Sequence, residues 1–216
     1  MTVRVGLRSV RRVKARIAVL ASGEGTNLQA LLDDPVVGGW IVLVVSDRTD
    51  AKALERARDR GIAAAHLDAN GYPDRASYDR ALRELLEGER VGYVALAGFM
   101  RMLGPEVVGA FEGRIVNVHP ALLPSFPGAH AVSDALAWGA KVTGVTVHLV
   151  DEQMDHGPIV AQEAVPILPD DDWDSLESRI HEVEHRLLPV AVRAMAEGRL
   201  RVEDRTVRVL EEAPDG

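Results

Sequence analysis

The sequence contains no cysteine. It therefore has no disulfide scaffold, no cysteine nucleophile, no thiolate zinc site and no iron–sulfur cluster. Only 4% of its residues are aromatic, which is too few for a platform on which single-stranded nucleic acid stacks. No apolar run approaches the roughly 18 residues that a membrane-spanning helix needs, so we expect no membrane partner.

Acidic residues outnumber basic ones by 33 to 25, which gives a formal net charge of −8. A generally acidic surface argues against nucleic-acid binding through overall charge, and we expect no nucleic-acid partner. An anionic small molecule remains compatible with this charge, because it needs only a local site. With 216 residues, of which 47% are hydrophobic, the chain is long enough to bury a core without a metal or a disulfide.

The first 16 residues contain six arginine or lysine residues and no acidic residue. Such a segment is compatible with an organelle transit peptide or a polyanion-binding arm, but it lacks the serine-rich composition of transit peptides. It also lacks the apolar stretch of a secretory signal. We therefore interpret residues 1–15 as a flexible basic extension and expect a cytoplasmic protein.

Short apolar runs alternate with amphipathic segments over the first 118 residues. The runs predict strands at 17–21, 41–45, 63–67, 93–97 and 114–118. Helices are predicted at 27–32, 51–60 and 73–87 and from Pro105 onward, with Asp50 capping the second and Gly61 ending it. This order predicts an α/β fold with an open, mostly parallel twisted sheet and helices on both faces.

The alternation changes after Val118. Residues 119–130 contain three prolines, which exclude a helix or a central strand and predict an ordered loop. Loops over the carboxyl edge of a parallel sheet are where ligands bind. Strands follow at 142–150 and 158–166, of which the second can run antiparallel, then a long helix at 173–197 and a hairpin at 200–210. We expect about seven strands in a single domain at 16–203, and a C-terminal hairpin or tail at 204–216.

A glycine-rich loop, Ser-Gly-Glu-Gly-Thr-Asn at 22–27, follows the first predicted strand and opens a helix. Glycines allow close approach of a ligand, and free N–H groups at a helix start can bind a phosphate. The loop is not a dinucleotide motif, because position 28 is leucine, and it lacks the lysine of a P-loop. A tight turn without a ligand explains the pattern equally well, and the motif alone leaves both interpretations open.

Asn117 and His119 end the fifth predicted strand. Strand alternation places these two side chains on one face and Val118 on the other. An amide donor beside an imidazole at the carboxyl edge of a sheet suits the stabilisation of an oxyanion and the transfer of protons. A single histidine is more often structural than catalytic, but the neighbouring asparagine, the strand end and the proline-rich loop favour function.

An acidic turn at 151–158 separates two predicted strands. Aspartate and glycine are typical of turns, so a polar turn without function explains the segment. Alternatively, its carboxylate lies near His119, raises the pKa of the imidazole and fixes its orientation. His148, inside a strand, is expected in the core or behind the site. The histidine spacings match no zinc site and no G-x-S-x-G motif occurs, so we expect neither a metal nor a serine nucleophile.

Together these segments resemble the phosphoribosylglycinamide formyltransferases, the folate-dependent enzymes of de novo purine synthesis. The resemblance runs from about residue 17 to residue 200, with motifs at 19–30, 97–103, 117–128, 142–148 and 155–159. The Asn-Val-His-Pro-Ala-Leu-Leu-Pro motif at 117–124 marks the wider family that uses 10-formyltetrahydrofolate. The Gly-Thr-Asn turn at 25–27 narrows the resemblance to the glycinamide ribonucleotide branch.

The resemblance implies that Asn117, His119 and Asp155 are the catalytic residues. The reaction it implies transfers the formyl group of 10-formyltetrahydrofolate to the amine of 5-phosphoribosylglycinamide. The amine attacks the formyl carbon directly, so neither a covalent enzyme intermediate nor a metal is needed. Asn117 and a protonated His119 are expected to stabilise the oxyanion, while Asp155 orients His119 and raises its pKa.

The resemblance also implies two sets of binding residues. Those for the ribonucleotide are Gly25, Thr26 and Asn27, which bind its phosphate, and Glu184, which contacts its sugar hydroxyls. Those for the folate are Arg75, Met100, Arg101, Met102, Leu103 and Asn117. Without the resemblance, Arg75 and Glu184 are expected on solvated helix faces. Glu24 must point outward, because a carboxylate beside the phosphate would repel it.

Several alternatives remain open. A formyltransferase for aminoacyl-tRNA would carry an extra RNA-binding domain, and a formyltetrahydrofolate hydrolase an N-terminal regulatory domain; 216 residues leave no room for either. A sugar-amine formyltransferase is disfavoured by the phosphate-type turn, and a dehydrogenase by the failed dinucleotide motif. A non-catalytic folate- or nucleotide-binding module could use the same cleft, although the catalytic set is intact. We expect small-molecule partners only and leave a homodimer open.

Overall fold

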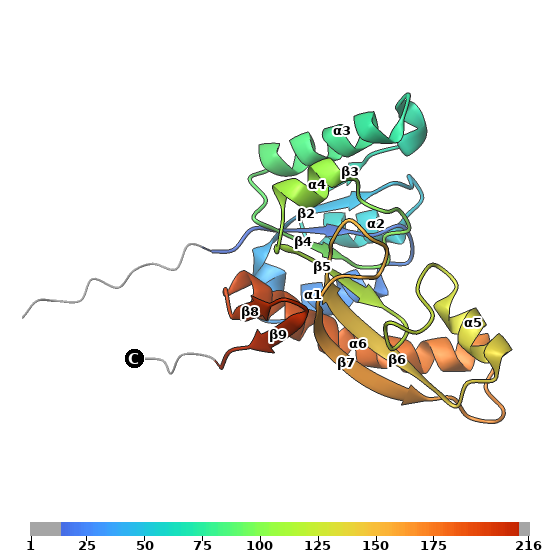
Figure 1. Cartoon of the computed structure of the whole chain (residues 1–216). Coiled ribbons are helices and arrows are strands. Elements are labelled where there is room, and N and C mark those ends of the chain that lie inside the picture. Colours follow the sequence, from blue (N-terminus) through green and yellow to red (C-terminus); the bar gives the residue numbers. More distant parts are fainter. Residues whose placement is uncertain (1–13, 212–216) are drawn as a thin grey trace, which may run out of the picture.

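A computed structural model describes residues 14–211 (Figure 1). Most of the predicted basic extension, up to residue 13, lies outside the described residues, as do residues 212–216 of the predicted tail. Within residues 14–211, every helix is too short or too polar to cross a membrane.

Five parallel strands form one half of a single sheet. They are β1 (Ile17–Leu20), β2 (Ile41–Ser46), β3 (Ala63–His66), β4 (Tyr93–Leu96) and β5 (Ile115–His119). Their spatial order is β3-β2-β1-β4-β5, so the chain reverses direction across the sheet between β1 and β4. Ligands of open parallel sheets bind beyond the carboxyl ends of the strands at such a reversal.

Four further strands extend the sheet. They are β6 (Val142–Leu149), β7 (Ile159–Pro166), β8 (Leu200–Glu203) and β9 (Thr206–Val209). β6 runs antiparallel to β5 and β7 antiparallel to β6, whereas β9 joins β7 in parallel through one residue pair, Ile159 with Thr206. The sheet therefore has nine strands rather than the predicted seven or so, because the C-terminal hairpin joins its edge.

Helices cover both faces of the sheet, as predicted (Figure 1). On one face lie α1 (Thr26–Asp33), α2 (Lys52–Asp59), α5 (Ala131–Trp138) and α6 (Trp173–Ala196), and on the other α3 (Arg75–Gly88) and α4 (Pro105–Ala110). The alternation of side chains along β1 divides the core accordingly: Ile17 and Val19 pack with the first group, Ala18 and Leu20 with the second. Two short 3₁₀ turns, η1 (Val37–Trp40) and η2 (Ala69–Gly71), complete the order.

The structure differs from the sequence-based prediction in two local features. The predicted cap at Asp50 is wrong: Ala51 precedes α2, and the Asp50 carboxylate accepts hydrogen bonds from Arg48 instead. Gly61 does follow α2 with a left-handed φ of 67°. The sequence also does not predict α5, whose buried residues are mostly alanine and give a weak apolar stripe.

Candidate active site

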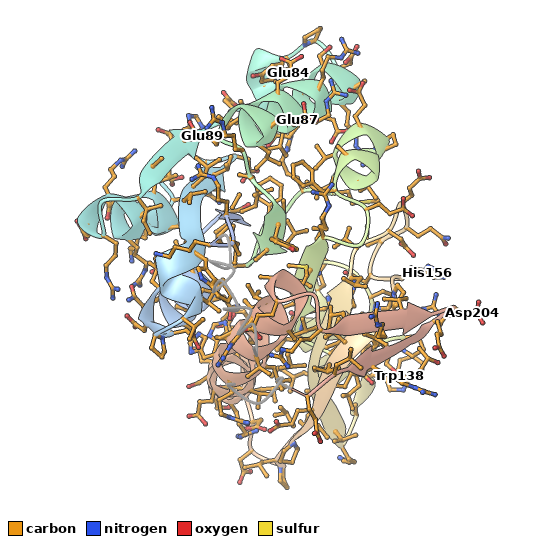
Figure 2. All side chains as sticks on the ribbon, turned by 90° about the vertical axis from the view of Figure 1, so that its left-hand side faces the viewer. Glu84, Glu87, Glu89, Trp138, His156 and Asp204 are labelled. Carbon is orange, nitrogen blue, oxygen red and sulfur yellow. The ribbon has the colours of Figure 1, made fainter. Side chains whose placement is uncertain are left out.

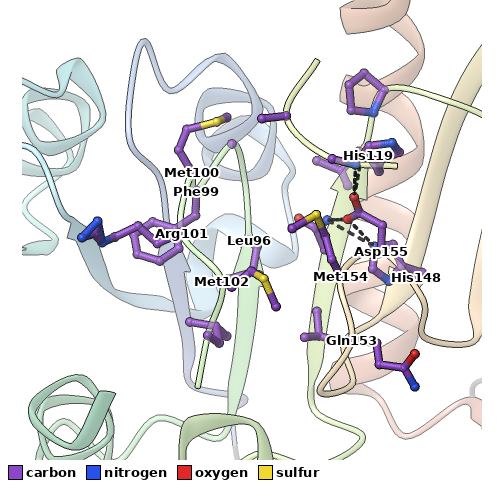
Figure 3. A pocket seen from close by; sticks show the side chains of 18 of the residues that line it. Leu96, Phe99, Met100, Arg101, Met102, His119, His148, Gln153, Met154 and Asp155 are labelled. Atoms are coloured by element: carbon purple, nitrogen blue, oxygen red, sulfur yellow. Dashed lines mark hydrogen bonds and ion pairs between the residues drawn. The ribbon is translucent and has the colours of Figure 1, made fainter. Parts of the chain in front are cut away.

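The segments after β4 and β5 lie at the carboxyl edge of the parallel strands, and the loop after the antiparallel β6 reaches them. Between these three segments lies a cavity of about 210 Å³ (Figure 3). Its lining comes from three parts of the chain: residues 96–103 after β4, residues 117–129 from β5 into the proline-rich loop, and residues 148–155 at the end of β6. The proline-rich loop thus lies where the sequence predicts a ligand-binding loop.

The segment after β4 is fixed to its neighbours through Ser22. The Ser22 backbone N–H donates to the Gly98 carbonyl at 2.9 Å, and the Met100 N–H donates to Ser22 Oγ at 2.9 Å. Ser22 Oγ in turn donates to Asp47 at 2.6 Å. The loops beyond β1, β2 and β4 are therefore one hydrogen-bonded unit.

Arg75 lies beside the same segment, as the resemblance implies. Its Nη2 donates to the Leu103 carbonyl at 2.9 Å and to the Met102 carbonyl at 3.4 Å. Arg75 lines a second, adjacent hollow together with Met100, Arg101 and Met102. The structure thus brings the six predicted folate residues together around two neighbouring cavities, with Asn117 and Leu103 in the first.

Asp79 also supports this segment, and sequence reasoning missed it. Its buried carboxylate accepts three backbone N–H bonds, from Gly104 at 2.7 Å, Glu106 at 3.0 Å and Val107 at 3.1 Å. A Cβ atom at position 104 would lie 2.6 Å from that carboxyl group, so a side chain there would displace the carboxylate from these bonds. The one available signal was an aspartate on the otherwise apolar face of a predicted helix.

Asp155 lies between the other two predicted catalytic residues. One of its carboxylate oxygens is 3.4 Å from Asn117 Nδ2, and the other is 3.5 Å from His119 Nδ1 (Figure 3). The Gly128 N–H donates to the same carboxylate at 2.7 Å. Asp155 has a left-handed φ of 49°, a conformation that aspartate adopts more readily than most residues other than glycine.

His148 contacts the same group from behind, as expected for a supporting residue. Its Nδ1 lies 2.8 Å from the Leu149 carbonyl, which can only accept, so Nδ1 carries the proton. Its Nε2 lies 3.2 Å from Asn117 Nδ2 and 3.7 Å from Asp155 Oδ1, so the ring faces both groups.

The pKa values of His119 and Asp155 are both lowered, which favours the neutral form of the imidazole and the charged form of the carboxylate. Burial lowers the pKa of His119, and the nearby Asp155 carboxylate opposes this effect without cancelling it. Asp155 thus acts on His119 in the predicted direction, but the predicted net rise of the pKa is wrong, because the imidazole is 4% exposed. Burial also opposes ionisation of Asp155, yet the His148 ring, the Gly128 N–H and the charge of His119 together hold its pKa below the usual range.

The His119 ring has an acceptor at each nitrogen. Nε2 lies 2.8 Å from the Phe126 carbonyl, so it carries a proton, while Nδ1 faces Asp155. A second proton on Nδ1 would therefore meet a carboxylate.

The glycine-rich loop begins α1, with Gly25 at a left-handed φ of 71°. A Cβ atom there would lie 2.9 Å from Ala53 Cα, so the loop needs glycine for packing as well as for its backbone angle. Glu24 points outward, as expected, and its carboxylate lies 2.7 Å from Lys52 Nζ.

Asn27 and Glu184 meet directly, although 157 residues separate them in the chain. Asn27 Nδ2 donates to Glu184 Oε2 at 2.8 Å, where α1 packs on α6. Glu184 is 4% exposed, so the solvated helix face expected from its spacing is wrong. Burial raises the pKa of Glu184, against the Asn27 hydrogen bond and the His181 ring, whose Nε2 is 3.8 Å away. Among the described residues Asn27 Oδ1 is buried and accepts no hydrogen bond.

Comparison with known proteins identifies the family. The family model described as formyl transferase matches residues 15–192. The chain belongs to the formyl transferase family. Phosphoribosylglycinamide formyltransferase of Mycobacterium tuberculosis is 45% identical over 93% of this chain and 94% of its own length, and that of Escherichia coli is 39% identical over 87% and 90%.

Longer and solved relatives agree with this family membership. The trifunctional purine biosynthetic protein adenosine-3 of Drosophila pseudoobscura pseudoobscura is 44% identical over 96% of the chain, which spans only 15% of that protein. Glycinamide ribonucleotide transformylase 1 from Symbiobacterium toebii superimposes with a TM-score of 0.88 at 49% identity, covering 91% of this chain and 94% of that one. A formyltetrahydrofolate deformylase from Pseudomonas syringae pv. tomato, at 27% identity, has a TM-score of 0.84 and covers 93% and 67%.

In this formyl transferase family member the predicted site residues form two groups. Asn117, His119 and Asp155 share a cavity with the segment after β4, whereas the turn at 25–27 and Glu184 do not line it. Ser22 joins the groups, since it precedes that turn and binds Gly98 and Met100. Within residues 14–211, no cluster of three or more histidine or acidic side chains is placed to hold a metal ion.

Proposed function

We propose that this protein transfers the formyl group of 10-formyltetrahydrofolate to the amine of 5-phosphoribosylglycinamide, giving the N-formyl product and tetrahydrofolate in the biosynthesis of purines and IMP. The observation that carries the proposal is the meeting of Asn117, His119 and Asp155 in the cavity lined by the segment after β4. Three relatives that align with this chain over 90% or more of their own length carry names that support the same reaction.

The proposed chemistry is a direct acyl transfer. The glycinamide nitrogen forms a bond to the formyl carbon, and the carbonyl oxygen gains negative charge in a tetrahedral intermediate. The Asn117 amide lies beside His148 and donates to that oxygen in place of its 3.4 Å contact with Asp155. Removal of one such donor typically costs roughly 10²–10³ in rate. The bond from carbon to the folate nitrogen then breaks, and a proton moves from the attacking nitrogen to the leaving nitrogen.

His119 responds to the developing charge. Its lowered pKa favours a neutral ring before the reaction. A negative oxygen nearby stabilises the protonated ring, and Asp155 lies within 3.5 Å to accept the added N–H. Asp155 thus orients the ring and supports its positive charge during the step that needs it, and it can hold a water that carries the proton.

The ribonucleotide would bind beside this cavity. The backbone N–H groups of Gly25, Thr26 and Asn27 open α1 and suit a phosphate. Lys52 neutralises Glu24, so this carboxylate does not oppose the anion. Glu184 and Asn27 Oδ1 offer buried acceptors for the sugar hydroxyls, which would satisfy an oxygen that has no other partner among the described residues.

An absorbance assay with 10-formyltetrahydrofolate or a stable dideaza analogue tests the proposal. We expect deformylated folate to accumulate only when 5-phosphoribosylglycinamide is present. No turnover would contradict the proposal. Equal folate loss with and without the ribonucleotide would also contradict it and would indicate hydrolysis, the reaction named for the deformylase that shares this fold. The His119→Ala variant is the control for enzyme-independent loss.

A further inference from the structure

The C-terminal hairpin reaches the loop that carries Asp155. β8 and β9 are joined by a two-residue turn, Asp204 and Arg205, with Asp204 at a left-handed φ of 54°. The pairing of Thr206 with Ile159 fixes this turn beside the residues that precede β7. Figure 2 shows the result: His156 and Asp204 lie close together on the same side of the molecule.

Arg205 contacts both the backbone and the ring of His156. Its Nη2 donates to the His156 carbonyl at 2.5 Å, and its Nη1 lies 3.3 Å from His156 Nε2. Because arginine only donates, Nε2 must accept, and the ring proton of neutral His156 is on Nδ1. That Nδ1 donates to Asp151 Oδ2 at 2.7 Å. Arg205 is therefore the outer end of a chain of bonds that crosses the loop.

The loop has few other attachments. Its base is closed by the hydrogen bond from the Leu149 N–H to the Pro158 carbonyl, at 2.9 Å. Within residues 14–211, the hydrogen bonds from outside the loop to residues 151–157 go to Asp155 on the inner side, from Asn117 and Gly128, and to His156 on the outer side, from Arg205. Arg205 thus supplies the outer attachment of the segment that presents the Asp155 carboxylate.

We propose that Arg205 is a positioning residue that holds loop 150–158, and with it the Asp155 carboxylate, toward His119 and Asn117. Its expected effect on turnover rests on the proposed function, whereas its effect on the loop does not. Arg205 lies beyond residue 192, where the match to the formyl transferase family ends.

The first test compares Arg205→Ala with Arg208→Ala in steady-state kinetics. Arg208 is exposed on the same hairpin, opposite Arg201, and serves as the matched control. We expect Arg205→Ala to lower kcat about threefold to tenfold, in line with the loss of hydrogen bonds to an exposed arginine. The KM for the folate analogue should rise, since Asp151, Gln153 and Met154 line its cavity. The KM for the ribonucleotide should stay within about twofold, and Arg205→Lys should be intermediate because it keeps one donor.

The second test measures the loop itself by hydrogen–deuterium exchange. In Arg205→Ala we expect peptides covering residues 150–158 to exchange about threefold to tenfold faster, with no change in Arg208→Ala. His156→Ala removes the ring contact from the loop side, keeps the bond from Arg205 to the backbone carbonyl and leaves the hairpin intact. It therefore separates the loss of the contact from any loosening of β8 and β9 by Arg205→Ala. In the double variant the loss should be no larger than in Arg205→Ala alone.

Unchanged kcat and unchanged loop exchange in both Arg205→Ala and His156→Ala would overturn the proposal. If the protein fails to transfer formyl groups, the exchange experiment still decides it, because that measurement needs no substrate. Faster loop exchange with unchanged kcat would also overturn it, since the loop would then move without displacing Asp155 in a way that affects the reaction.

Discussion

Asp155 and Glu184 are carboxylates whose side chains are 11% and 5% exposed, and the Asp155 residue is half-buried whereas Glu184 is fully buried. Their pKa values move in opposite directions. Burial opposes ionisation of both, but Asp155 also receives the Gly128 N–H and faces two histidine rings, which together lower its pKa. Glu184 has one Asn27 amide and a more distant His181, so burial prevails and raises its pKa. Glu184 is both the more deeply buried and the one with fewer donors, and these two differences together decide which carboxylate stays charged.

The difference suits the two proposed roles. A charged Asp155 can support a positive His119 while an oxyanion forms. A Glu184 that takes up a proton readily can exchange hydrogen bonds with neutral hydroxyl groups, which is what recognition of a sugar requires. The following predictions test this contrast, from the largest expected effect to the smallest.

The largest effect is expected on catalysis. His119→Ala and Asp155→Asn should each lower kcat by roughly 10²–10³, because each removes a group that acts on the developing negative charge. KM values for both substrates should change little. Single-turnover kinetics with saturating substrates would measure the step directly, and an undiminished kcat in either variant would remove that residue from the mechanism.

Asp79 extends the comparison to a third buried carboxylate. Asp79→Ala leaves the N–H groups of Gly104, Glu106 and Val107 without their acceptor. The bonds from Gly104 and Val107 are buried, and each buried unsatisfied group costs roughly 1–3 kcal/mol. We expect a fall of about 2–6 kcal/mol in the free energy of unfolding by urea titration and a raised KM for the folate analogue. Asp79→Asn, which keeps one acceptor, should lose less. Equal losses in the two variants would show that charge rather than hydrogen bonding matters there.

Glu184→Gln should weaken binding of the ribonucleotide without slowing the chemical step. We expect its KM to rise about tenfold, as for the loss of one or two hydrogen bonds, with kcat nearly unchanged. Isothermal titration with 5-phosphoribosylglycinamide would confirm the loss as a change in Kd. A large fall in kcat would instead indicate that Glu184 acts in the chemical step, as proposed for Asp155, and would contradict the difference in role between the two carboxylates.

The smallest effect is the pH dependence of stability. A raised pKa means that Glu184 contributes stability fully below its unfolded pKa, near 4.5, and loses it as pH rises through the folded value. The lowered pKa of Asp155 means the reverse: its contribution is present above the unfolded value, near 3.8, and is lost as pH falls through the folded value. Urea titrations of Glu184→Gln and Asp155→Asn should therefore differ from those of the unsubstituted protein with opposite pH slopes.

The sheet was largely predictable because buried parallel strands are continuous apolar runs. Val19 and its neighbours identify β1, and the same holds for β2, β4 and β5. The sheet edge was not predictable: β9 joins through one pair, Ile159 with Thr206, and a pairing between distant segments leaves no periodic trace in either. The sequence did not predict α5, because its alanines give little difference in hydrophobicity between the buried and exposed faces of the helix.

The sequence predicted which residues form the candidate site better than it predicted their pKa shifts. Asn117 and His119 stand out locally because they end a strand before a proline-rich loop. Asp155 lies near His119 only because the fold brings distant segments together. The same holds for Asp79 beside Gly104 and for Glu184 beside Asn27. The sign of the His119 pKa shift depends on how completely neighbouring segments exclude water, and that balance is set by packing of the whole chain.

The nine-stranded sheet ends in β3 at one edge and β8 at the other, and each is four residues long. β8 carries Arg201 and Glu203, so this edge is both short and charged, whereas β3 is short and consists of three alanines and a histidine. Short, charged edges are poor templates for the addition of a strand from another molecule. The β8 edge is thereby protected against growth into extended β-assemblies at high protein concentration, and the β3 edge has only its shortness to limit such growth.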